Sequence, residues 1–171
     1  MSKITFKGSR YQLAGELPAL GGKAPDFSLV TTELRDVSID HWLNKRKILN
    51  VFLSVDLEVC AKSVIAFDRY AAAHDDLAML MISVDLPFAH ARFRKEHDLQ
   101  QVTQLSAIRH AGFGENYGVQ ITEGPLKGFF ARAVIVVDEN NSVVYTELVE
   151  DVTEEPDYAA AFRSLAIDIE E

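Results

Sequence analysis

The chain between residues 48 and 84 has the sequence ILNVFLSVDLEVCAKSVIAFDRYAAAHDDLAMLMISV. Its two ends, residues 48–53 and 77–84, are short apolar runs typical of strands buried on both faces of a sheet. Between them, four apolar or small residues recur at helical spacing: Cys60, Val64, Phe67 and Ala71. Asp56 can cap this helix. A strand, a helix and a strand in succession predict a parallel pair of strands.

The same alternation continues after residue 84. Asp85 and Pro87 open a second helix that extends to about His97. Residues 102–128 are then broken into loops by Gly112, Gly114, Gly118 and Gly124, and we expect this segment to form a connection on the surface.

The two ends of the chain complete the pattern. Residues 129–137 and 142–149 predict a hairpin closed by the turn DENN, and residues 155–157 begin a final helix. Alternation over residues 4–13 predicts an N-terminal β-hairpin. The whole order is typical of an α/β protein with a thioredoxin-like fold, a central mixed β-sheet flanked by helices.

Length and composition indicate one globular domain spanning residues 1–171, since 48% of the residues are hydrophobic and 25% are charged. The net charge of -9 argues against nucleic acid and anionic membranes as partners. The first residues lack the apolar core of a signal peptide, and no apolar run is long enough to span a membrane. We therefore expect a cytoplasmic protein.

Cys60 is the only cysteine, so neither an intramolecular disulfide nor a Cys-rich zinc site can form. Its place in the first turn of the predicted helix favours a thiolate, because unpaired N–H groups and the helix dipole stabilise an anion there. The alternative is a structural cysteine in the apolar stripe of that helix.

A reactive thiolate at this position needs a cationic partner, because Asp56 and Glu58 lie beside it in the sequence. Arg132 is the candidate, since it is the only charge in the apolar run of residues 129–137. The alternative is an arginine that extends to solvent from the end of a strand. The five histidines show no metal-ligand spacing, and we expect them to have surface or capping roles. No glycine pattern is typical of a nucleotide-binding loop. We therefore expect neither a metal nor a cofactor.

Residues 117–133, YGVQITEGPLKGFFARA, resemble the signature YGVxIxxGPLxGLxARAV of the thiol peroxidase branch of the peroxiredoxins. Further segments match the same family in order: APDF (24–27), RKILN (46–50), SVD (54–56), VCA (59–61), DLPFA (85–89) and EPDY (155–158). Together they span nearly the whole chain.

The resemblance implies an antioxidant oxidoreductase whose peroxidatic, redox-active residue is Cys60 and whose thiolate-stabilising residue is Arg132. Hydrogen peroxide or an alkyl hydroperoxide would oxidise Cys60 to a sulfenic acid. An external thiol, from a thioredoxin-like protein or a low-molecular-weight thiol, would then reduce it. Family members commonly form homodimers, so a homodimer is implied as well.

Three positions depart from the family. In the motif PxxxTxxC, Leu53 replaces the proline and Leu57 replaces the threonine. The second change removes a hydroxyl group that would donate a hydrogen bond to the peroxide. Ser54 could supply this donor only if its side chain reached the site. The family's resolving cysteine corresponds to Arg94, which we expect to be exposed on its helix.

These losses leave alternatives to a slower peroxidase with one cysteine. The first is a relative that acts as a thiol redox sensor or a binding protein. The second is reduction of a mixed disulfide, although Cys60 has no partner in a CxxC motif.

Overall fold

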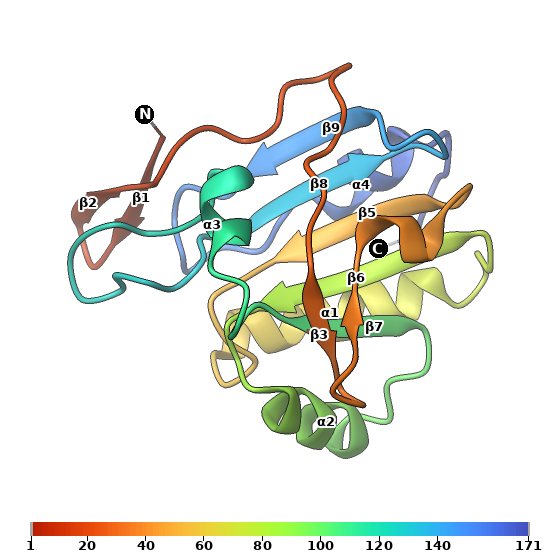
Figure 1. The fold of residues 1–171 in the computed structure, drawn as a ribbon, viewed down its shortest axis with the longest axis horizontal. Helices are drawn as coiled ribbons and strands as arrows, with labels where there is room; N and C mark the ends of the chain where they lie inside the picture. The colour runs from red at the N-terminus through yellow and green to blue at the C-terminus, as the bar shows by residue number, and fades with distance from the viewer. Residues whose placement is uncertain (1, 171) are drawn as a thin grey trace.

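The centre of the molecule, a computed structural model that describes residues 2–170, is a seven-stranded mixed sheet (Figure 1). In spatial order its strands are β4 (Asp36–Val37), β3 (Leu29–Thr31), β7 (Val102–Ser106), β6 (Leu77–Ser83), β5 (Arg46–Val51), β8 (Ala133–Val137) and β9 (Val143–Leu148). The three central strands β5, β6 and β7 run parallel, and the remaining pairs are antiparallel. The predicted parallel pairing of β5 and β6 is confirmed.

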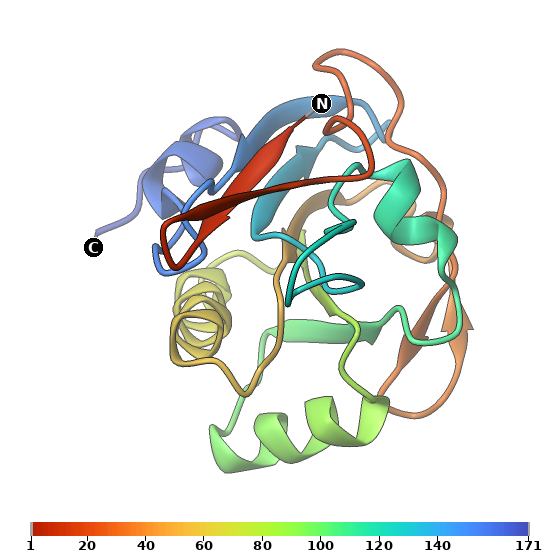
Figure 2. The same cartoon turned by 90° about the vertical axis from the view of Figure 1, so that its left-hand side faces the viewer.

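Helices cover both faces of this sheet because its central strands are apolar on both sides. All residues of β6 are buried, and successive residues of a strand such as Ile48 and Leu49 belong to different core clusters. One face is covered by α1 (Glu58–Ala71), α2 (Pro87–Glu96) and α4 (Tyr158–Arg163). The other is covered by the 3-10 helix η1 (Ile39–Trp42) and by α3 (Gly112–Asn116). Figure 2 shows α1 and α4 on one side of the sheet and α3 on the other. No helix in residues 2–170 has the length and apolar character needed to cross a membrane.

The predicted N-terminal hairpin is present as β1 (Lys3–Phe6) and β2 (Ser9–Gln12). It is joined to the segment that follows β9, because the amide of Thr5 donates to the carbonyl of Glu150 at 2.6 Å. It is also joined to the signature segment, because the amide of Thr122 donates to the carbonyl of Gln12 at 3.0 Å. The hairpin therefore ties together the two loops on either side of β8 and β9.

The prediction of a surface connection over residues 102–128 is wrong. This segment contains β7, the neighbour of β6, and its aromatic residues Phe113 and Tyr117 are buried. Gly118 explains part of the discrepancy, since its φ is +67° and a Cβ there would lie 2.1 Å from the carbonyl oxygen of Glu16. This glycine permits close packing of backbone against backbone, a requirement that looks like a loop signal in the sequence.

Candidate active site

The carboxyl ends of the parallel strands β5, β6 and β7 lie at one end of the sheet, and the connection from β5 leads there into α1, which carries Cys60. Cys60 is the third residue of α1, as the sequence predicted for its first turn. It is a free cysteine with no exposed surface, and it packs in the core cluster between α1 and the sheet. The buried sulfur therefore lies in an apolar environment beside a helix N-terminus.

The predicted cap of this helix is wrong. Leu57 occupies the N-cap position and its side chain makes no capping hydrogen bond. The carboxylate of Asp56 instead accepts a hydrogen bond from Arg92 at 2.8 Å, and Glu58 pairs with Lys62 at 3.5 Å. The first-turn N–H groups, including that of Cys60, consequently keep no side-chain cap, and both nearby carboxylates are paired with cations.

The backbone at Cys60 is fixed by two buried polar side chains. Ser63 donates its hydroxyl to the carbonyl oxygen of Cys60 at 2.8 Å, and the amide Nδ2 of Asn50 donates to the hydroxyl of Ser63 at 3.1 Å. Asn50 is the only polar residue in the apolar run of residues 48–53. A single polar residue in an apolar strand is a sequence signal for a residue near the site, although Asn50 was not among the predicted site residues.

Arg132 lies one residue before β8, whose observed start at Ala133 is later than the predicted strand. Pairing of Val51 with Ala133 places Arg132 at the same end of the sheet as the β5–α1 connection. Its neighbour two residues along β8, Val134, belongs to the core cluster of Cys60, so alternation directs Arg132 to the same face. The sheet therefore brings both predicted site residues to one end and one face.

The guanidinium of Arg132 is completely buried, so the alternative of an arginine that extends to solvent is wrong. Its Nη2 donates to the carbonyl oxygen of Val152 at 3.0 Å. Its Nε and Nη1 have no hydrogen-bond partner among residues 2–170. Buried charges with free donors are costly in a protein interior, and an anion or an oxygen atom bound beside these two nitrogens would satisfy them.

The two motif positions that depart from the peroxiredoxin pattern also lie here. Leu53 is buried in the core, whereas Leu57 is 45% exposed at the start of α1. The hydroxyl of Ser54 donates to the carboxylate of Asp85 at 2.7 Å, so in this arrangement its proton is not available for a peroxide. The donor lost with the motif threonine is therefore not replaced by Ser54.

Comparison with known proteins identifies the family of the chain. The family model described as Redoxin matches residues 19–162. The chain belongs to the redoxin family. It is 46% identical over 165 residues to the thiol peroxidase of Corynebacterium glutamicum, a match that covers 96% of this chain and 99% of that protein. It is 44% identical, with the same coverage, to the thiol peroxidase of Mycobacterium bovis.

Solved structures give the same result for the fold of this redoxin. A peroxiredoxin-like protein from Aquifex aeolicus matches with a TM-score of 0.90 and 32% identity, covering 96% of each chain. The thiol peroxidase from Chromobacterium violaceum matches with a TM-score of 0.87 and 28% identity, covering 96% of this chain and 95% of that one. The predicted thioredoxin-like fold and the resemblance to the thiol peroxidase branch are both confirmed.

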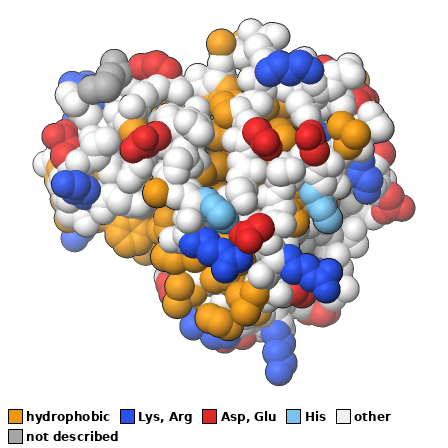
Figure 3. Space-filling view, viewed as in Figure 1, with side chains coloured by type: hydrophobic (Ala, Val, Ile, Leu, Met, Phe, Trp, Pro, Cys, Tyr) orange, Lys and Arg blue, Asp and Glu red, His pale blue; other side chains and the backbone are white. Residues whose placement is uncertain are grey.

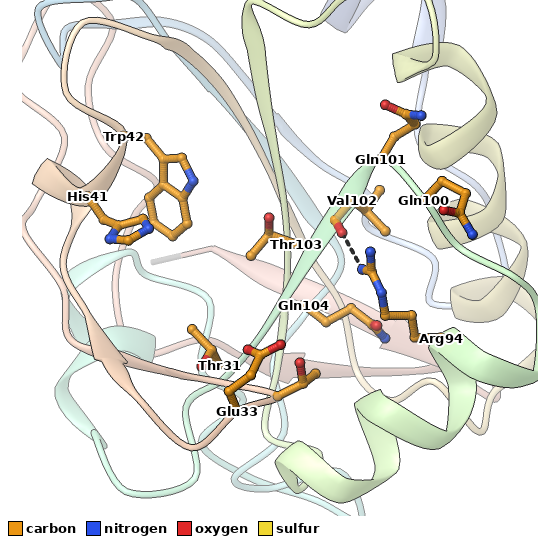
Figure 4. A pocket seen from close by; sticks show the side chains of 11 residues that line it. Thr31, Glu33, His41, Trp42, Arg94, Gln100, Gln101, Val102, Thr103 and Gln104 are labelled. Atoms are coloured by element: carbon orange, nitrogen blue, oxygen red, sulfur yellow. Dashed lines mark hydrogen bonds between the residues drawn. The ribbon is translucent and has the colours of Figure 1, made fainter.

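Arg94, which occupies the position of the family's resolving cysteine, is half-buried, so the prediction of an exposed residue is wrong. Its Nη1 donates to the carbonyl oxygen of Val102 at 2.7 Å, which joins α2 to the start of β7 (Figure 4). Arg94 lines a polar pocket of about 340 Å³, but neither Cys60 nor Arg132 lies in its wall. In this redoxin the position has a structural contact in place of a second thiol.

His90 is the histidine that departs from the predicted surface and capping roles, since it is completely buried. The hydroxyl of Ser83 donates to Asp85 at 2.6 Å, so His90 Nε2, 3.1 Å from that hydroxyl, acts as the donor to it. Nδ1 then accepts from Gln104 Nε2 at 3.3 Å. Burial lowers the pKa of His90 to about 4, which keeps the imidazole neutral. Within residues 2–170 no three His, Cys, Asp or Glu side chains gather to hold a metal.

Proposed function

We propose that this redoxin is a thiol-dependent peroxidase in which Cys60 reduces hydrogen peroxide or an alkyl hydroperoxide and Arg132 stabilises the reacting atoms. The observation that carries the proposal is the pair of unpartnered guanidinium nitrogens of Arg132. They are buried on the same face and at the same end of the sheet as the first turn of α1, which contains Cys60. A buried cation with free donors beside a helix N-terminus is suited to an anionic sulfur.

The reaction transfers one oxygen atom to sulfur. The thiolate of Cys60 attacks the peroxide oxygen that carries a hydrogen atom, an S–O bond forms and the O–O bond breaks. The leaving oxygen departs with the electron pair of that bond and takes up a proton, which gives water or an alcohol, while the sulfur is oxidised to a sulfenic acid. Nε and Nη1 of Arg132, with the first-turn N–H groups of α1, supply donors where negative charge develops.

Recycling requires a thiol from outside the chain, because Cys60 is the only cysteine. A thioredoxin-like protein or a low-molecular-weight thiol attacks the sulfenic sulfur and releases water, and a second thiol resolves the mixed disulfide. Because Cys60 is fully buried, the proposal requires the first turn of α1 to open for the peroxide as well as for this reductant.

We further propose that the protein acts in the cytoplasm as a homodimer. Support for association comes from apolar side chains around the active-site end of the sheet, where Leu57, Leu86 and Phe88 are 45%, 51% and 66% exposed. Figure 3 shows hydrophobic side chains gathered on the lower left of the molecule, near the start of α2. Exposed apolar surface of this kind is typical of association sites.

The test is peroxide consumption by the purified reduced protein. Hydrogen peroxide and cumene hydroperoxide are supplied with dithiothreitol, with Cys60→Ser as the control, and intact mass is read after a single addition without reductant. The proposal predicts turnover in the wild type, an added oxygen on Cys60 and neither in the variant. Turnover that persists in Cys60→Ser, or a wild-type thiol that does not react, would refute it and favour a sensing or binding role.

A further inference from the structure

A single carboxylate holds the turn that precedes Cys60. Asp85 lies two residues after the end of β6, and its Oδ1 accepts the hydroxyl of Ser54 at 2.7 Å. Its Oδ2 accepts the backbone N–H of Val55 at 2.9 Å. The hydroxyl oxygen of Ser54 in turn accepts the N–H of Asp56 at 3.1 Å. Three consecutive residues of the turn are therefore linked, directly or through one hydroxyl, to Asp85.

Asp85 is itself fixed to the ends of two parallel strands. Ser83, the last residue of β6, donates to Oδ2 at 2.6 Å, and its hydroxyl also accepts the N–H of Asp85 at 3.1 Å. Ser106, the last residue of β7, donates its hydroxyl to the carbonyl oxygen of Asp85. The buried His90 donates to Ser83 and completes the support. The turn is consequently attached to the rigid centre of the sheet.

This attachment matters because the turn lacks its usual stiffening residue. The motif proline is replaced by Leu53, whose backbone is not restricted in φ, and Leu57 adds no capping bond at the start of α1. The hydrogen bonds that Ser54 and Val55 donate to Asp85 join the turn to the segment that follows β6.

We propose that Asp85 is a positioning residue of the peroxidase reaction, whose carboxylate fixes the turn of residues 54–57 and thereby holds Cys60 in place relative to Arg132. The inference rests on the proposed function. Displacement of a reacting group by about 1 Å can cost on the order of 10²-fold in rate. We therefore expect Asp85→Asn, which replaces an acceptor oxygen with a donor, to slow Cys60 oxidation by about 10-fold or more.

The matched control is Asp68→Asn. The carboxylate of Asp68 also holds a turn, since Oδ1 accepts the backbone N–H groups of Gln100 at 3.0 Å and Gln101 at 2.6 Å, but that turn lies between α2 and β7. Both variants lose a carboxylate that binds backbone amides. Only Asp85→Asn should lower the second-order rate constant for cumene hydroperoxide, measured on protein shown to be folded by circular dichroism.

A double-mutant cycle with Arg132→Met separates positioning from general stability. If Asp85 acts by placing Cys60 against Arg132, Asp85→Asn adds little to the loss already caused by Arg132→Met. Independent, multiplicative losses would overturn the proposal, as would a normal rate in Asp85→Asn. Ser54→Ala removes one of the two hydrogen bonds that join Asp85 to the turn, so we expect a smaller decrease in the rate of Cys60 oxidation than in Asp85→Asn. This variant provides a second test if Asp85→Asn does not fold.

Hydrogen exchange tests, without peroxide, whether Asp85 holds the turn of residues 54–57. Asp85→Asn should speed amide exchange over residues 54–61 and leave the strands protected. Unchanged exchange there would overturn the proposal even if the enzyme is active. A wild-type protein that does not react with peroxide would overturn the proposed function instead, and local exchange would still show whether Asp85 holds the turn.

Discussion

Replacing Arg132 with methionine should separate catalysis from stability. Arg132 and Lys47 are both cations with no exposed surface, but their hydrogen bonding differs. Lys47 donates to the carbonyl of Lys45 and to Oδ1 of Asn141, each at 2.8 Å. Arg132 makes one described bond, to Val152, and buries two nitrogens without a partner. Lys47→Met is the matched control.

The expected magnitudes follow from these contacts. Arg132→Met gives up one charged hydrogen bond, worth about 1.5–3 kcal/mol, but relieves two buried unsatisfied donors that cost about 1–3 kcal/mol each. We expect a free energy of unfolding within about 1 kcal/mol of wild type or above it. Lys47→Met leaves two acceptors unpaired and should lose about 2–4 kcal/mol.

Activity should show the reverse order. Loss of one preorganised donor costs about 10²–10³-fold, so Arg132→Met should slow peroxide oxidation of Cys60 by at least that factor, whereas Lys47→Met should retain the wild-type rate while folded. The assays are urea unfolding and stopped-flow oxidation with cumene hydroperoxide. An Arg132→Met protein that is several kcal/mol less stable yet oxidised at the wild-type rate would refute the reasoning.

Three further predictions concern other positions. Leu57→Thr restores a hydroxyl donor at the N-cap of α1. It should raise the rate of Cys60 oxidation about tenfold or more and stabilise α1 by about 1 kcal/mol. An unchanged rate and an unchanged stability would contradict this prediction. Burial lowers the pKa of His90 to about 4, so between pH 6.5 and 4 the unfolded chain binds more protons than the folded chain. The free energy of unfolding, measured by urea titration, should therefore fall by up to about 3 kcal/mol as the pH drops through that window. This pH-dependent fall should be absent in His90→Gln. Gly118→Ala should lower the free energy of unfolding by about 3 kcal/mol or more, because the added Cβ would lie 2.1 Å from the carbonyl oxygen of Glu16. In the control Gly8→Ala the added Cβ has nothing within 4 Å, so the loss should be only about 1–2 kcal/mol. Equal decreases in melting temperature for the two variants would contradict the packing argument.

The parts of the fold that the sequence predicted are those whose signal is local. The apolar runs of β5 and β6 and the helical repeat of α1 each specify one element without reference to the rest of the chain. β7 was missed because Thr103 and Gln104 interrupt its apolar pattern. Gln104 is tolerated there because its amide bonds to His90, a contact that no local pattern shows.

The candidate site divides in the same way. Cys60 and Arg132 stand out in the sequence as a lone thiol and a lone charge in an apolar run. The sequence places Asp85 at the start of a helix and in the family segment DLPFA, but it does not show the contact to the turn, because Ser54 and Val55 precede Asp85 by about thirty residues. Asp56 was assigned a capping role that fits its position, but Arg92 from α2 binds its carboxylate instead. Such competition between partners is decided by tertiary packing.

The most direct test is the second-order rate constant with which cumene hydroperoxide oxidises Cys60 in the reduced wild-type protein, compared with free cysteine at the same pH. Buried donors from Arg132 and the N-terminus of α1 predict a rate constant well above that of free cysteine, with one oxygen added to Cys60 by intact mass. A rate constant equal to or below that of free cysteine would contradict the assignment of this redoxin as a peroxidase.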